Sequence, residues 1–186
     1  MKILCYITGL NLDKLINYFD NVNENDIIEH AVDGIWFKQQ KPNPFTIISI
    51  TMLLIFSFLV PLQTVSLAFK LPPSIAVSIT YPPILFVMAL NILAMRSVLK
   101  GRKWAILVFK YVFFIDCLLL LLSLYLSFSS DNTHWQLLII PTCMLLWCRI
   151  LLNCPSFSSL IKFYLHRKLV ANDIGGILDK TKKRKK

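Results

Sequence analysis

Long apolar runs alternate with short polar segments along this chain. The longest run extends from Trp104 to Phe128, and a helix of that length rises about 37 Å along its axis. Since the hydrocarbon core of a bilayer is about 30 Å thick, this run can cross it with some tilt. The pattern therefore predicts an all-α membrane protein with four transmembrane helices, at 45–69, 74–95, 104–128 and 135–154.

Polar segments flank these runs and divide the chain into three parts: 1–44, a transmembrane domain at 45–154, and 155–186. In the first part, apolar residues between Leu12 and Phe19 recur at helical spacing, and a second short helix is predicted to begin near Asn25. The first part is thus a small helical segment outside the membrane. In the last part, an apolar stripe that includes Leu160 and Leu165 predicts an amphipathic helix lying in the headgroup layer.

Composition and charge placement support insertion in a membrane. The chain is 56% hydrophobic and only 16% charged, whereas about 25% charged residues is typical of soluble domains. Its net charge of +10 comes from lysines and arginines at the ends of the apolar runs and in the tail, which disfavours nucleic acid as the partner. Four of these basic residues lie between the second and third runs: Arg96, Lys100, Arg102 and Lys103.

The distribution of positive charge also predicts an orientation. The connection after Phe128 contains no lysine or arginine, and the connection before Ser74 contains only Lys70. Because positive charge marks cytoplasmic loops, both termini and the middle connection are predicted to be cytoplasmic. The short connections, the absence of a glycosylation sequon on the predicted outer loops and the Asn/Ile/Lys-rich composition favour the bacterial inner membrane.

Prolines and basic residues modify the predicted spans. Pro82 and Pro83 deny two backbone carbonyls their helical donors, which predicts a kink in the second span. Lys110 lies about 9 Å into the third span and Arg149 near the end of the fourth, so both long side chains can reach the headgroups. The predicted anchors to anionic lipid headgroups are Lys110, Arg149 and the tail residues Lys182, Lys183 and Arg184.

Asp116 is an acidic residue inside the third apolar run. It lies about 18 Å from the start of the third run, where a short side chain reaches neither surface, so it is either protonated or paired inside the bundle. By depth, its candidate partners are Ser57, Thr80, Tyr81 and Thr142. Two interpretations follow: a hydrogen bond that joins helices, or part of a proton or cation pathway.

Nothing in the sequence indicates an enzyme, a cofactor or a metal site. The three histidines lie in separate segments, the five cysteines lack CxxC spacing, and no HExxH, GxSxG or P-loop motif occurs. The expectation is a non-enzymatic accessory protein, for example a regulatory subunit or an immunity-like protein, that binds another membrane protein or itself. Its layout is similar to that of colicin-type immunity proteins, which block pore-forming toxins, in architecture alone. The alternative is a small oligomeric transporter or channel subunit that uses Asp116.

Overall fold

The computed structural model describes residues 10–21, 43–69, 72–129 and 133–168, and within these ranges the regular structure is helical. The second helix predicted near Asn25 and the basic tail with Lys182, Lys183 and Arg184 lie outside the described residues. The elements in chain order are α2 (Leu10–Asn21), α4 (Phe45–Ala68), α5 (Pro73–Val98), α6 (Trp104–Ser129), the 3-10 helix η2 (Thr133–Leu138) and α7 (Ile139–Leu152). A further helix covers 155–168.

Four helical segments are long and apolar enough to cross a membrane, which confirms the predicted architecture. They are Phe45–Ala68, Pro73–Val98, Trp104–Ser129 and Gln136–Asn153. The bounds agree with the predicted spans to within a few residues. The second span differs most, because α5 continues to Val98, three residues beyond the predicted end. The last span begins with η2, and its α-helical part starts at Ile139.

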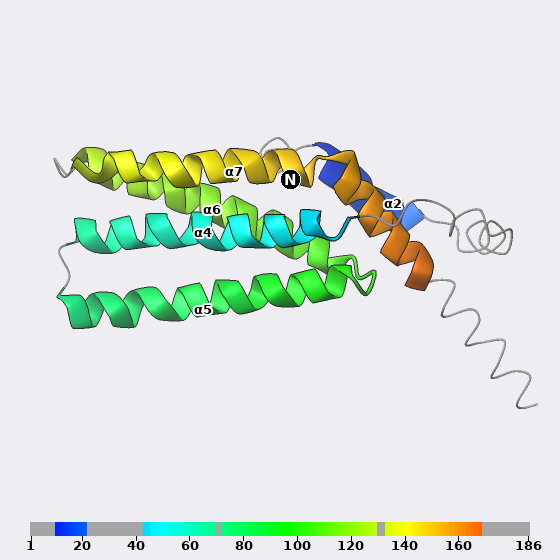
Figure 1. The fold of residues 1–186 in the computed structure, drawn as a ribbon. Coiled ribbons are helices and arrows are strands. Elements are labelled where there is room, and N and C mark those ends of the chain that lie inside the picture. Colours follow the sequence, from blue (N-terminus) through cyan, green and yellow to red (C-terminus); the bar gives the residue numbers. More distant parts are fainter. Residues whose placement is uncertain (1–9, 22–42, 70–71, 130–132, 169–186) are drawn as a thin grey trace, which may run out of the picture.

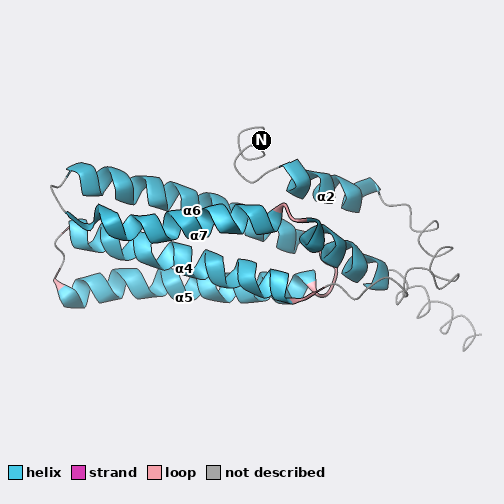
Figure 2. Ribbon diagram, turned by 45° about the horizontal axis from the view of Figure 1, so that its top comes forward, coloured by secondary structure: helices cyan, strands magenta, loops and turns pink. Residues whose placement is uncertain are grey.

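The helix α4 holds the bundle together. It packs against α5, α6 and α7 (Figures 1 and 2). The helices α6 and α7 make few contacts with each other. The sequence of α4 explains this position, since Ile47, Ile50, Leu54 and Phe58 recur every three or four residues and are all buried. Side chains at that spacing share one face of a helix, so α4 presents a continuous apolar stripe to its neighbours.

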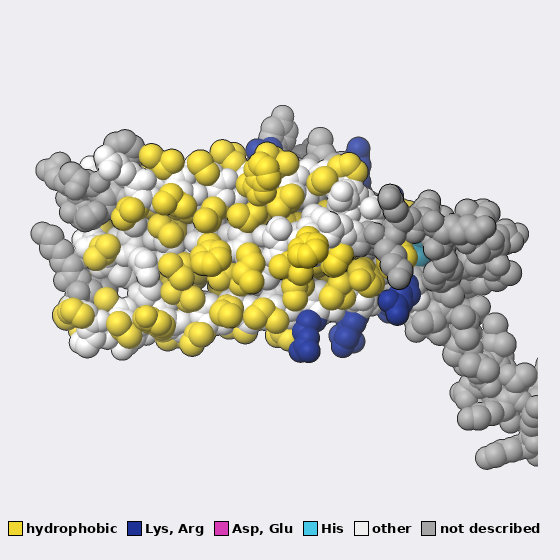
Figure 3. Space-filling model, viewed as in Figure 1, with side chains coloured by type: hydrophobic (Ala, Val, Ile, Leu, Met, Phe, Trp, Pro, Cys, Tyr) yellow, Lys and Arg dark blue, Asp and Glu magenta, His cyan; other side chains and the backbone are white. Residues whose placement is uncertain are grey.

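The outer surface of the spans is apolar. Figure 3 shows hydrophobic side chains along the length of the bundle, as a surface in contact with acyl chains requires. The helix α5 is the least buried span, and its residue Phe86 is 67% exposed. It runs without interruption through Pro82 and Pro83, so the kink there stays a prediction.

The helix α2 and the helix over 155–168 cover one end of the bundle. We call it the basic end, because it carries the connection with Arg96, Lys100, Arg102 and Lys103. Phe157, Leu160 and Ile161 are buried in one hydrophobic cluster with Leu12 and Leu15 of α2.

The amphipathic helix therefore forms as predicted, but the environment of its apolar stripe differs from the prediction. Leu160 is fully buried and Leu165 is 6% exposed, so the stripe packs on the protein itself. Spacing along a helix predicts an apolar face, and it does not distinguish a protein core from the headgroup layer as the surface that covers this face.

Gly101 allows this helix to approach the end of the bundle. Its φ of 61° lies in the left-handed region, and its N–H donates to the Val98 carbonyl at 2.8 Å. A Cβ atom added at Gly101 would lie 2.8 Å from the backbone oxygen of Tyr164. The turn between α5 and α6 thus contacts the backbone of the helix over 155–168 directly, with no space for a side chain.

Candidate functional site

Asp116 and Ser57 form a hydrogen-bonded pair inside the bundle. Asp116 on α6 and Ser57 on α4 are both fully buried, and Ser57 Oγ lies 2.7 Å from Asp116 Oδ2. Both residues lie about 18 Å along their helices from the basic end, which places the pair in the middle of the hydrocarbon layer. The prediction that Ser57 lies beside Asp116 agrees with this geometry.

The geometry of the pair favours a neutral carboxylic acid. Ser57 Oγ also lies 3.1 Å from the carbonyl oxygen of Leu54, yet a serine hydroxyl has only one hydrogen to donate. If Asp116 carries a proton, it donates to Ser57 Oγ and Ser57 donates to Leu54, so both short distances are hydrogen bonds. An ionised Asp116 would instead compete with the carbonyl for one hydrogen. It would also leave a charged oxygen unsatisfied, because Asp116 Oδ1 has no partner among the described residues.

The other polar residues predicted at this depth do not reach Asp116. Thr80 bonds Ser66 of α4 at 2.9 Å, Tyr81 is exposed on the outer surface, and Thr142 donates to the carbonyl of Leu138 in its own segment. Thr80 lies about 10 Å from the start of α5 at Pro73. It is therefore level with the C-terminal part of α4, which contains Ser66, and not with the middle of α4. Of the four predicted partners, the structure brings only Ser57 to Asp116.

Two of the predicted headgroup anchors, Lys110 and Arg149, lie among the described residues, and they differ in exposure. Arg149 is exposed near the end of α7, as a headgroup anchor requires. Lys110 is only 5% exposed, so its side chain lies within protein and not along the lipid-facing surface. The prediction for Lys110 rests on its distance from the end of the span, and that distance does not show which face of α6 the residue occupies.

A cavity of about 550 Å³ lies along the seam where α6 and α7 are loosely packed. Its walls are mainly apolar, with Cys117, Thr142 and Arg149 among the lining residues. Asp116 is adjacent to Cys117 in the sequence, but it faces α4 and does not line this cavity. The buried acid therefore lies outside this cavity.

Sequence reasoning missed two features of the buried polar network. The Ser66–Thr80 bond joins α4 to α5, so α4 forms a side-chain hydrogen bond with each of two neighbouring spans. Asn91 on α5 is fully buried, donates to the carbonyl of Val87, and has an Oδ1 atom without a partner among the described residues. A polar residue inside an apolar run was the signal that marked Asp116, and the same signal marks Asn91.

A second group of polar contacts joins α2 to the basic end. The hydroxyl of Tyr18 lies 2.8 Å from Nε2 of His166, and Lys162 Nζ lies 4.7 Å from the centre of the Tyr18 ring. Asp20 forms a salt bridge with Lys103 at 2.6 Å, which is exposed on both sides and so of modest strength. Burial and the positive charge of Lys162 lower the pKa of His166, and burial raises the pKa of Tyr18. Near neutral pH, both partners of the Tyr18–His166 contact are therefore uncharged.

The four spans and the buried polar contacts define the class of protein to which the chain belongs. Among the described residues, no group of histidine, cysteine or acidic side chains is placed to hold a metal ion. No family model, curated protein or solved structure matches the chain. The fold and the buried polar network are those of a four-span helical membrane protein.

The Ser57–Asp116 bond is tested by a double-mutant cycle. In the parent, Ser57→Ala leaves the buried acid without its partner and is expected to lower the free energy of unfolding by about 1–2 kcal/mol. In an Asp116→Leu background the same change is expected to have little effect, which gives a coupling energy of about 0.6–1.7 kcal/mol. Unfolding in mixed micelles measures both values.

The control is Ser123→Ala, because Ser123 is buried on α6 and donates only to the Leu120 carbonyl of its own helix. It should have equal effects in both backgrounds. An equal effect of Ser57→Ala with and without Asp116 would contradict the interaction.

The lowered pKa of His166 predicts a pH dependence at the basic end. Because the pKa falls below 6.5 in the folded protein, neutral His166 contributes its full stability above about pH 6.5, and this stability is lost as the pH falls further. Protonation places a second positive charge beside Lys162 in a buried position. Hydrogen exchange of amides in 155–168 should therefore quicken at about pH 5, after correction for the intrinsic rate. His166→Gln should remove this dependence, and unchanged protection in the parent would refute it.

Proposed function

We propose that this protein is a non-enzymatic accessory protein that binds another membrane component through its transmembrane helices. The position of Asp116 carries the proposal, because the acid is fully buried, bonded to Ser57 and absent from the walls of the cavity between α6 and α7. A polar group so placed joins helices, and its burial leaves the apolar outer surface as the place of interaction. A regulatory subunit and an immunity-like protein are the two forms of this role that the small bundle favours.

The proposed location is the bacterial inner membrane, with both termini on the cytoplasmic side. The support is the charge of the basic end, where Arg96 lies in the last turn of α5 and three further basic residues lie in the connection to α6, whereas the residues 129–134 at the opposite end contain no lysine or arginine. Four spans return the chain to the side on which it starts.

A reporter experiment tests this orientation. A cytoplasm-active reporter inserted at Lys100 or fused after Lys186 should be active, and one inserted at Asn132 should be inactive, because positive charge is retained in the cytoplasm. A reporter that is active only outside the cytoplasm should give the opposite pattern. Equal activity at Asn132 and after Lys186 would exclude the four-span orientation.

A transporter or channel subunit is the second candidate function. It is favoured by two buried oxygen atoms, Asp116 Oδ1 and Asn91 Oδ1, that have no partner among the described residues. Such oxygen atoms inside a membrane are the kind of group that a proton or cation pathway uses. Both side chains are fully buried, so a pathway that uses them would run through the interior of the bundle.

Cross-linking in native membranes tests the accessory role. A photoreactive residue is placed at one exposed position on each span, namely Met52, Phe86, Leu121 and Leu146. A binding protein should give one product of defined size from one or two of these positions, and that product should persist in Asp116→Asn, which keeps a hydrogen-bonding side chain. A product of twice the chain mass would identify self-association, and lipid adducts alone from all four positions would contradict the proposal.

The same Asp116→Asn variant distinguishes the transport role from the accessory role. Purified protein in liposomes with an imposed pH gradient should show no proton flux above that of empty liposomes if the accessory role is correct. A flux that the parent supports and Asp116→Asn abolishes would instead establish the transport role, because an amide does not titrate.

A further inference from the structure

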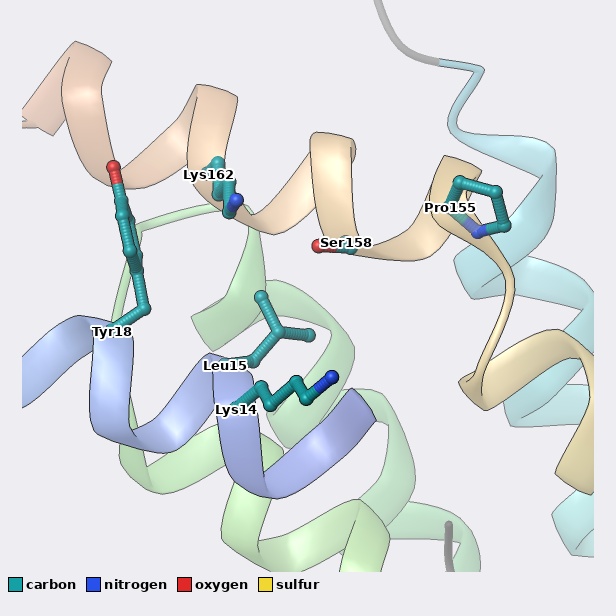
Figure 4. A pocket seen from close by; sticks show the side chains of 6 residues that line it. All are labelled: Lys14, Leu15, Tyr18, Pro155, Ser158 and Lys162. Carbon is teal, nitrogen blue, oxygen red and sulfur yellow. The ribbon is translucent and has the colours of Figure 1, made fainter. Parts of the chain in front are cut away.

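A cavity of about 310 Å³ lies between α2 and the start of the helix over 155–168 (Figure 4). The helix α2 contributes Lys14, Leu15 and Tyr18, and the second helix contributes Pro155, Ser158 and Lys162. In Figure 4 the amino group of Lys162 and the hydroxyl of Ser158 lie on the side of their helix that faces α2. Residues almost 150 positions apart in the sequence thus form one small site.

The cavity is positively charged, and its charge is not compensated by the described acidic side chains. Asp20 pairs with Lys103, and Asp116 lies in the middle of the spans, so neither forms a salt bridge with Lys14 or Lys162. The Tyr18 ring holds Lys162 at 4.7 Å and so restricts one of the two ammonium groups without neutralising it. Two cations and the Ser158 hydroxyl, which has no partner among the described residues, surround one hollow and are suited to a compact anion.

The cavity also lies close to the end of the last span. The span that contains α7 ends at Asn153, and Pro155, which begins the next helix, is a lining residue. One lining residue, Pro155, is therefore within one helical turn of the end of this span. A phosphate group carried by a lipid and one carried by a small soluble molecule both have access to that level.

We propose that this cavity binds a phosphate monoester group. Lys14 and Lys162 supply two positive charges that match the two negative charges of a phosphomonoester, and the Ser158 hydroxyl donates a hydrogen bond to one of its oxygens. Tyr18 acts by positioning Lys162, since its own hydroxyl is engaged by His166. The proposal is independent of the accessory role and concerns a different part of the molecule.

Binding is measured on the full chain in neutral detergent, by titration with inorganic phosphate and with glycerol phosphate. Lys14→Gln and Lys162→Gln are each expected to weaken binding about fivefold, since each removes one of two charges from a partly exposed site. Lys168→Gln is the matched control, because Lys168 is an exposed lysine of the same helix that does not line the cavity. It should leave binding within twofold of the parent.

A second arm identifies the source of the phosphate group. The protein is placed in nanodiscs of phosphatidylcholine alone, with phosphatidic acid, or with phosphatidylglycerol, and its thermal unfolding is recorded. A shift with phosphatidic acid that is larger than with phosphatidylglycerol and is lost in Lys14→Gln identifies a lipid monoester. A shift lost only on removal of soluble phosphate identifies a free ester.

Lys14→Gln keeps the contact between Lys162 and Tyr18, so this variant separates loss of binding from loss of the helix contact. If Lys14→Gln matches the parent with every probe, or if Lys168→Gln weakens binding equally, the cavity is not a phosphate site and the proposal is overturned.

Discussion

Inside a bilayer, a polar side chain finds its hydrogen-bond partners within the protein, since the surrounding hydrocarbon offers none. This constraint gives α4 its central place. Its apolar stripe packs on three neighbours, and its serines bond Asp116 of α6 and Thr80 of α5. The hydrophobic effect does not hold spans together once they are in lipid, so close packing and these few bonds fix the arrangement. The loosest seam, between α6 and α7, is also where the large cavity lies.

The sequence predicts depth along a span much better than direction around it. The rise of a helix fixes how far Ser57 and Asp116 lie from the basic end, and the two meet as predicted. Thr80 is an exception, because it lies only about 10 Å from the start of α5 at Pro73, which is too shallow to be level with Asp116, and it meets Ser66 instead. Lys110 is the clearest case in which the sequence does not predict the side of the helix that a residue occupies. Its depth is compatible with lipid headgroups, but it lies on a buried face of α6.

The basic end could not be predicted, because its contacts join segments that are far apart in the chain. Nothing in the pattern of Leu12 and Leu15 identifies Phe157 and Leu160 as members of the same hydrophobic cluster. Tyr18 and His166 are separated by 148 positions and Asp20 and Lys103 by 83, so neither contact follows from local spacing. Gly101 is a partial exception, since a glycine between two long helices predicts a tight turn. Its close approach to Tyr164 is visible only in the folded chain.

Lys162 connects the titration of His166 with the proposed anion site at the basic end. Its charge disfavours protonation of His166, and the same charge lines the cavity between α2 and the helix over 155–168. An anion bound at Lys162 would offset that charge and so make protonation of His166 less unfavourable. By linkage, protonation of His166 must then strengthen binding of the anion by the same factor. This linkage favours binding in acid, and it is opposed by the second pKa of a phosphate monoester, about 6, below which the ligand itself loses one of the two charges that Lys14 and Lys162 match.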